Sequence, residues 1–319
     1  MVLFMNVFEN KENIILDDLF EYFLAYKKRK LKVTSIKNIL ERYNRWIKPK
    51  FGQIIVDQIN LDDIFIWKDN LIANDYSELY TNTIISEFNQ LITFGINRKL
   101  ISNTILLEEL DKIKMHKIVD ERKVLTMEQI NTFLDSFDLT NEKEYGYWLY
   151  FYAFANSGMR PNEFRCLQVK DIQGDYLKVN KTVTSKLGKG EDFLQPPKSV
   201  CSIRKVLMPH EIIELLLDYT KEYKEDDFIF GKDKIYRETN LNRVLKAHLE
   251  ACNLQPIVLY GFRHSHATHL INSGIPIKIV SKRLGHKNTS TTMDTYWHLM
   301  SDDEDRILEA FLAPKNKKR

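Results

Sequence analysis

The apolar residues in the first third of the chain recur at the spacing of a helix. Leu16, Leu19 and Phe23 fall on one helical face, and comparable patterns run through residues 36–46 and 80–94. Apolar residues three and four positions apart are typical of an amphipathic helix that buries one stripe. We therefore expect the first part of the chain to be all-helical.

This pattern lapses in a charged stretch at residues 115–123, which has the composition of an interdomain linker. The 319 residues exceed the length of one average domain, and 44% hydrophobic with 29% charged residues is ordinary for a globular protein. We place the boundary at 118, which gives a helical domain at 1–118 and a second domain at 119–319.

The second domain is predicted to begin with a helix at Met127. Thr126 and Gln129 have the spacing of a capping box, and Leu125 and Ile130 are placed for a hydrophobic staple. Downstream, the aromatic segment 147–154 lacks strict alternation and ends at Ser157-Gly158, so it is interpreted as a buried helix whose rings belong to the core. Helical patterns resume at 212–219, 241–254, 264–271 and 277–284.

Two short stretches of the second domain have the pattern of strands. Leu177, Val179 and Val183 alternate with polar residues, and a second run covers 203–208. A long basic loop lies between them. The predicted fold class is therefore mainly α with a small β-sheet.

Cysteine spacing and hydropathy indicate in which cellular compartment the protein is expected. Cys166, Cys201 and Cys252 lie far apart, which indicates neither a disulfide framework nor a zinc site and fits a reducing cytoplasm. No apolar run approaches membrane-spanning length, and the N-terminal stretch lacks the basic start of a signal peptide. A net charge of +3 is too small to identify a nucleic-acid partner.

Four segments of the second domain carry the residues that indicate a function. They are Gly158–Glu163, Pro197–Arg204, Tyr260–His264 and Leu284–Tyr296. Each is weak alone, but together and in this order they resemble the tyrosine recombinases, the family of the phage integrases. The resemblance covers the chain from Val124 onward. The helical first domain resembles, less specifically, the core-binding (SAM-like) domain of that family, which implies a two-domain DNA clamp with a catalytic second domain.

The resemblance implies that Tyr296 is the nucleophile. A tyrosine can attack a phosphodiester and hold it as a covalent phosphotyrosyl intermediate, which conserves the energy of the bond. A neutral phenol has a pKa of about 10 and must lose its proton as it attacks. Arg160 and Arg263 match the family's arginine pair, whose guanidinium groups donate to the non-bridging oxygens as negative charge accumulates. Structural ion pairs are the alternative for both arginines.

Lys198 is the candidate general acid that would protonate the leaving 5′ oxygen, and Lys186 and Lys189 of the same loop are its rivals. His286 matches a position from which the ring can hydrogen-bond the phosphate or buttress the nucleophile, with a core histidine as the alternative.

Tyr260 stands where most relatives carry a histidine thought to be the general base. We hypothesise that Tyr260 only hydrogen-bonds the phosphate or Tyr296, which leaves the general base shared or absent.

Three further histidines, His264, His266 and His269, lack the spacing of a metal site and are expected to be structural. No cofactor is expected, neither metal nor ATP.

After Tyr296, a capping box at Ser301 predicts a terminal helix with an apolar stripe. The resemblance implies that this helix docks on a neighbouring protomer; packing on its own domain is the alternative.

The resemblance thus implies a site-specific DNA recombinase or integrase of the bacterial cytoplasm, associated with the nucleoid when bound. Its partners would be double-stranded DNA at recombination sites, a homotetramer on that DNA and accessory DNA-bending factors, with no membrane. The chain is expected to lack the small N-terminal arm-binding domain of many integrases. Two alternatives remain open: a catalytically weakened DNA-binding relative of the same fold, and DNA relaxation of the type IB kind.

Overall fold

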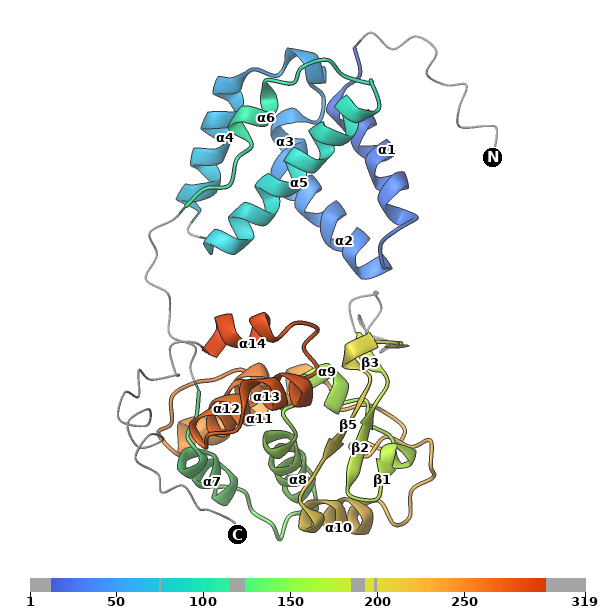
Figure 1. Cartoon of the computed structure of the whole chain (residues 1–319), viewed down its shortest axis with the longest axis vertical. Coiled ribbons are helices and arrows are strands. Elements are labelled where there is room, and N and C mark those ends of the chain that lie inside the picture. The colour runs from blue at the N-terminus through green and yellow to red at the C-terminus, as the bar shows by residue number, and fades with distance from the viewer. Residues whose placement is uncertain (1–12, 75, 115–123, 185–192, 198–199, 297–319) are drawn as a thin grey trace, which may run out of the picture. The chain divides into compact units, whose positions relative to one another are not determined.

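The computed structural model describes residues 13–74, 76–114, 124–184, 193–197 and 200–296 (Figure 1). The chain divides into two compact units, Met1–Val119 and Asp120–Arg319. The boundary that we predicted at 118 falls within residues 115–123, which lie outside the described ranges.

Unit 1 is helical throughout its described elements. In chain order these are α1 (Leu16–Lys28), α2 (Val33–Arg42), a π-helical turn (Tyr43–Ile47), α3 (Lys48–Phe51), a 3₁₀ turn (Val56–Gln58), α4 (Leu61–Ala73), α5 (Glu78–Asn97) and α6 (Leu106–Glu109).

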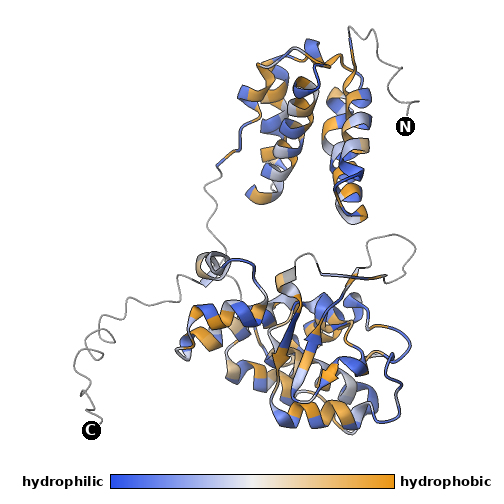
Figure 2. Ribbon diagram, turned by 45° about the vertical axis from the view of Figure 1, so that its right-hand side comes forward, coloured by the Kyte–Doolittle hydropathy of each residue, from blue (hydrophilic) through white to orange (hydrophobic). Residues whose placement is uncertain are grey.

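The apolar face predicted for the first helix forms part of the core of unit 1. Leu16, Leu19 and Phe23 are at most 2% exposed, and Phe20 stacks on Tyr43 with ring centroids 3.5 Å apart. Burying one such side chain contributes roughly 1.5–3 kcal/mol, so packing stabilises these helices more than their intrinsic propensity does. Figure 2 shows apolar and polar faces on the helices of this unit, and the expectation of an all-helical first part is confirmed.

Unit 2 is mainly helical with small sheets, as predicted. Its helices are α7 (Met127–Asp135), α8 (Glu142–Ser157), α9 (Pro161–Phe164), α10 (His210–Tyr219), α11 (Glu238–Ala251), α12 (Leu259–Asn272), α13 (Ile277–Leu284) and α14 (Thr289–Tyr296). Its strands are β1 (Ile172–Gln173), β2 (Tyr176–Val179), β3 (Thr182–Thr184), β4 (Phe193–Gln195) and β5 (Arg204–Leu207), with 3₁₀ turns at Val169–Asp171 and Val200–Ser202.

The strands form two antiparallel sheets. One has the order β1-β2-β5, with Leu177 of β2 opposite Val206 of β5, and the other pairs β3 with β4. Leu177, Val179 and Val206 are buried in the same cluster as the helices, so the three-stranded sheet packs on the helical core. Of the first predicted β-like stretch, Leu177 and Val179 pair with the second stretch, whereas Val183 lies in β3 and pairs with β4. The expectation of a small sheet is confirmed.

Local signals set the helix ends that matter for the site. The capping box at Thr126 and Gln129 is formed in both directions, with N···O distances of 3.2 and 3.0 Å. The aromatic segment forms α8, in which Tyr150, Phe151 and Phe154 are at most 1% exposed. The interpretation of this segment as core is confirmed for these rings.

Candidate active site

The turn between α8 and α9 fixes the position of Arg160. Gly158 ends α8 with φ at +64°, and an ideal Cβ there would lie 2.5 Å from Cδ2 of His266. Only glycine adopts this conformation without strain. Pro161 then occupies the first position of α9, a place that suits proline, with Arg160 at the N-cap. The guanidinium of Arg160 therefore projects from a rigid turn.

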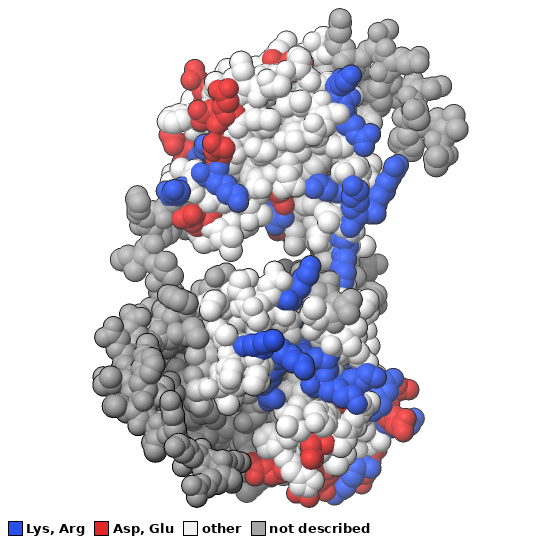
Figure 3. Space-filling view, viewed as in Figure 1, with Lys and Arg blue, Asp and Glu red and all other residues white. Residues whose placement is uncertain are grey.

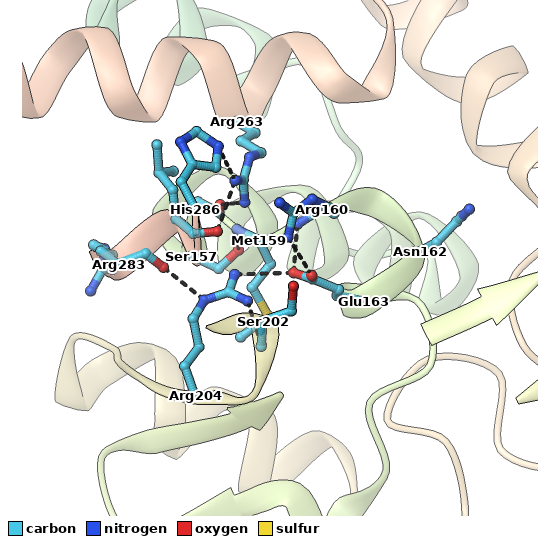
Figure 4. A network of polar contacts seen from close by, with 12 residues as sticks. Ser157, Met159, Arg160, Asn162, Glu163, Ser202, Arg204, Arg263, Arg283 and His286 are labelled. Carbon is cyan, nitrogen blue, oxygen red and sulfur yellow. Dashed lines mark hydrogen bonds and ion pairs between the residues drawn. The ribbon is translucent and has the colours of Figure 1, made fainter. Parts of the chain in front are cut away.

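A buried carboxylate holds this arginine and joins it to β5 (Figure 4). Glu163, 4% exposed, accepts from Arg160 Nη1 at 2.8 Å and from Arg204 Nη2 at 3.0 Å. Arg204 also donates through Nε to the Arg283 carbonyl at 2.7 Å and through Nη1 to the Ser202 carbonyl at 3.0 Å. Burial alone would raise the pKa of Glu163, but the charges of Arg204 and Arg160 outweigh it and hold that pKa below its usual value.

Arg263 is buried within α12 and is held by acceptors on three sides. It is 2% exposed and donates to the Gly158 carbonyl at 2.7 Å, the Leu284 carbonyl at 2.8 Å and His286 Nε2 at 2.9 Å. Burial lowers the pKa of Arg263 to about 10, and the charge of Arg160 acts in the same direction. The group still carries its charge at neutral pH.

The contacts of His286 define its protonation. Because a guanidinium can only donate, Nε2 of His286 accepts from Arg263 and carries no proton. Nδ1 lies 2.7 Å from the Thr292 hydroxyl and is therefore the protonated nitrogen of the neutral ring. Burial, reinforced by the charge of Arg263, lowers the pKa of His286 to about 4, in agreement with a neutral ring at pH 7.

Tyr296 lies at the end of α14 and is 3% exposed, packed in one cluster with Ala267, Val280 and Leu284. Its hydroxyl oxygen lies 2.8 Å from Nδ1 of His264. A pocket of about 390 Å³ opens at this point. Its lining brings together four of the predicted residues with their neighbours: Tyr260, Arg263, His264, His286, Thr291, Thr295 and Tyr296.

Tyr260 contacts the site through its ring. The side chain is 37% exposed, its centroid lies 5.1 Å from that of the His264 ring, and the guanidinium carbon of Arg263 lies 6.0 Å from it. The hydrogen bond that the structure gives the Tyr296 hydroxyl is with Nδ1 of His264, and the hypothesis that Tyr260 contacts the phosphate or Tyr296 stays a prediction.

The three histidines of α12 have different surroundings. His266 Nε2 accepts from Arg283 Nε at 2.9 Å, and its Nδ1 faces the Ala155 carbonyl at 3.0 Å, which is the structural role predicted. Burial lowers the pKa of His266 to about 3. His269 is exposed and lines a different pocket. The prediction of a structural role does not account for His264, which sequence reasoning missed.

The remaining sequence candidates cannot be placed. Lys198, its rivals Lys186 and Lys189, and the predicted helix after Ser301 all lie outside the described residues.

Within the described ranges, no group of three or more histidine, cysteine, aspartate or glutamate side chains is positioned to hold a metal ion. None of the helices in that same part of the chain is long and apolar enough to cross a membrane.

Comparison with known proteins identifies the family. The model of the phage integrase family matches residues 123–302, which is more than half of the chain. The chain belongs to the phage integrase family. As a member it is a tyrosine-type site-specific recombinase, and the family resemblance inferred from the four segments is confirmed.

The relatives agree with this assignment. A tyrosine recombinase of Thermosipho africanus is 28% identical over 302 residues, which cover 90% of this chain and 96% of that protein. The Tn1549 transposon integrase, solved in complex with transposon right end DNA, has a TM-score of 0.78 at 19% identity and covers 94% of this chain and 100% of its own. A lambda integrase tetramer bound to a Holliday junction has a TM-score of 0.65 at 15% identity, covering 88% and 78%. The predicted fold class is thereby confirmed.

Proposed function

We propose that the protein cuts and rejoins DNA at specific sites through a covalent 3′-phosphotyrosyl intermediate on Tyr296, without metal or ATP. The observation that carries this proposal is the shared pocket in which the Tyr296 hydroxyl lies with Arg263 and His286. A phenol beside a buried guanidinium is suited to attack an anionic phosphodiester, because the guanidinium stabilises the charge that develops on the phosphate oxygens.

Arg160 and Arg263 would bind the two non-bridging oxygens. Within the described residues, three of the five N–H groups of Arg263 are engaged by Gly158, Leu284 and His286. These bonds fix the plane of the guanidinium, and the other two N–H groups would donate to a phosphate. Arg160, whose side chain is 32% exposed, is held at one edge by Glu163. Such preorganised donors require little rearrangement when the transition state forms.

His286 and Lys198 complete the proposed set. Neutral His286 accepts from Arg263, so we assign it to holding that arginine in place. Lys198 is our candidate for the general acid on the leaving 5′ oxygen, with Lys186 and Lys189 as its rivals. It belongs to the segment between β4, which ends at Gln195, and β5. Tyr260, whose ring borders the pocket, would contact the phosphate.

We further propose that unit 1 is the core-binding domain and unit 2 the catalytic domain. In Figure 3, Lys and Arg side chains form a band across one part of unit 2, whereas Asp and Glu gather at another. In unit 1, Lys28, Arg29, Lys30 and Lys32 are exposed where α1 gives way to α2. Basic surfaces of this kind grip the phosphates of duplex DNA and make affinity depend on salt. We expect a homotetramer on DNA, with accessory DNA-bending factors.

The test is the formation of a covalent adduct. A duplex is first selected from a random-sequence library by binding to the Tyr296→Phe variant, and a set of copies is then nicked at successive positions. A nick just beyond the cleavage point releases a short fragment, so the protein stays trapped on the DNA. We expect the unaltered protein to form an adduct that resists denaturation on one of these duplexes in buffer with EDTA and no ATP.

The matched control is Tyr176→Phe, which removes a hydroxyl from an exposed tyrosine of β2 that does not line the pocket. It should still form the adduct, whereas Tyr296→Phe should bind the duplex and form none. An adduct that persists in Tyr296→Phe overturns the proposal. Exchange of strands between two labelled duplexes separates recombination from mere relaxation of supercoils.

A further inference from the structure

His264 contacts the oxygen of the proposed nucleophile. It follows Arg263 on α12, and its Nδ1 lies 2.8 Å from the Tyr296 hydroxyl, with ring centroids 5.9 Å apart. Tyr296 is 3% exposed and enclosed by apolar side chains of α12 and α13. The packing that buries the phenol therefore holds its hydroxyl against this imidazole.

The other histidines near the pocket are engaged elsewhere. His286 accepts from Arg263 through Nε2 and holds the Thr292 hydroxyl through Nδ1. His266 lies between Arg283 and the Ala155 carbonyl. Neither ring has a nitrogen left to take a proton from the Tyr296 hydroxyl in this arrangement.

The charged and titratable groups that line the pocket with His264 come from three elements. Tyr260 and Arg263 lie on its own helix, Tyr296 ends α14, and His286 lies between α13 and α14. Tyr260 is a phenol and cannot accept a proton near pH 7, because protonated phenol is a strong acid. The buried cation of Arg263 favours the anionic form of any phenol in the same pocket.

We propose that His264 is a catalytic residue that accepts the proton of Tyr296 through Nδ1; this rests on the proposed function of Tyr296. In the step, the bond from the Tyr296 oxygen to phosphorus forms as the bond from phosphorus to the 5′ oxygen breaks. The phenolic proton passes to Nδ1, which leaves an imidazolium, and the 5′ oxygen takes a proton from the general acid, for which Lys198 is our candidate. In rejoining, the imidazolium returns its proton to the departing Tyr296 oxygen.

Two substitutions separate proton transfer from positioning. His264→Asn keeps an oxygen near the place of Nδ1 that can accept a hydrogen bond but not a proton, and His264→Phe keeps a ring without nitrogen. The control is His269→Asn, at an exposed position of the same helix. All are compared by single-turnover adduct formation on the selected nicked duplex across pH 5–9, with DNA affinity as the check on folding.

We expect the rate of the unaltered protein and of His269→Asn to rise with pH as the imidazole loses its proton. His264→Asn and His264→Phe should bind DNA normally but react about 100-fold or more slowly, without that step in the pH profile. A duplex whose 5′ leaving atom is sulfur needs no general acid, because a thiolate leaves without a proton. It should restore Lys198→Ala but neither His264 variant.

Three results overturn the inference. His264→Asn could react within threefold of the unaltered protein while Tyr296→Phe is inactive, which would refute the role of His264 alone. The sulfur-substituted duplex could restore His264→Asn, which would place His264 on the side of the leaving group. If the unaltered protein forms no adduct on any of the nicked duplexes, the proposed function fails and the role of His264 fails with it.

Discussion

Replacing Glu163 by glutamine removes the carboxylate that joins Arg160 to Arg204. The side chains of Glu163 and Arg204 are 4% and 8% exposed, whereas that of Arg160 is 32% exposed. Of these two ion pairs, therefore, only the one with Arg204 has both partners shielded from water. Breaking a buried ion pair by removing one partner costs roughly 3–5 kcal/mol. The glutamine keeps one acceptor oxygen, and Arg204 keeps the carbonyls of Ser202 and Arg283 as partners. We therefore expect a loss of about 2–3 kcal/mol in the free energy of unfolding of unit 2.

For a unit of this size, 1 kcal/mol shifts the midpoint of thermal unfolding by about 2–4 °C, so Glu163→Gln should lower it by roughly 5–10 °C. The matched control is Glu238→Gln. Glu238 also pairs with an arginine of unit 2, Arg165, but at 3.4 Å with a side chain that is 47% exposed. We expect this control to cost less than about 1 kcal/mol.

The difference in free energy of unfolding between the unaltered protein and Glu163→Gln should also depend on pH. The pKa of Glu163 lies below its usual value in the folded protein, so the stability it contributes is present above the pKa of the unfolded chain. It is lost as pH falls through the lower pKa of the folded state. Urea unfolding at pH 7 and pH 3 should therefore show the gap between the unaltered protein and Glu163→Gln closing at low pH. A Glu163→Gln midpoint no lower than that of Glu238→Gln would refute the reasoning.

Three further predictions concern the surroundings of the site. Gly158→Ala should lower the free energy of unfolding, measured in urea, by at least about 2 kcal/mol more than Gly174→Ala does. Both glycines have positive φ, but of the two only Gly158 would place a Cβ against another side chain, the ring of His266. Equal losses would contradict this. The pKa values of His266 and His286 fall to about 3 and 4 in the folded protein, so below pH 6.5 the unfolded chain binds more protons than the folded one. The free energy of unfolding should therefore drop by up to roughly 1.4 kcal/mol per pH unit per histidine between pH 6.5 and 5. His266→Gln should flatten this slope, and an unchanged slope would argue against a buried neutral ring. Affinity for the selected duplex should fall steeply and linearly on a plot of log affinity against log salt, and binding that is insensitive to salt would exclude a phosphate-gripping surface.

Local signals in the sequence were sufficient for much of the fold. The capping box at Thr126, the glycine that ends α8 and the apolar spacing of Ile277–Leu284 each specify a structure through neighbours within a few residues. The small sheet, in which β2 pairs with β5, was predicted from two β-like stretches in an otherwise helical domain. Pro161 behind Arg160 is a local signal of the same kind, because proline suits the first position of a helix.

The contacts that organise the site could not be predicted in the same way. His264 and Tyr296 are 32 residues apart, and Glu163 and Arg204 are 41 apart, so both contacts depend on how separate elements pack. Helical geometry shows that neighbouring histidines of α12 face different directions, but it does not show which of them faces Tyr296. Glu163 stood within one of the four segments, and its spacing from Arg160 was the one local sign of its role.

The identity of the nucleophile is tested most directly by locating the DNA on the protein. Trypsin cleaves after Lys287 and Arg306, so Tyr296 lies on a peptide that contains no other tyrosine, and Tyr260 likewise lies alone on a peptide ending at Arg263. The adduct is digested with nuclease and trypsin, and fragmentation in the mass spectrometer finds the residue that carries the nucleotide. We predict a nucleotide on Tyr296. A nucleotide on Tyr260, or on any other residue, would contradict the proposed mechanism.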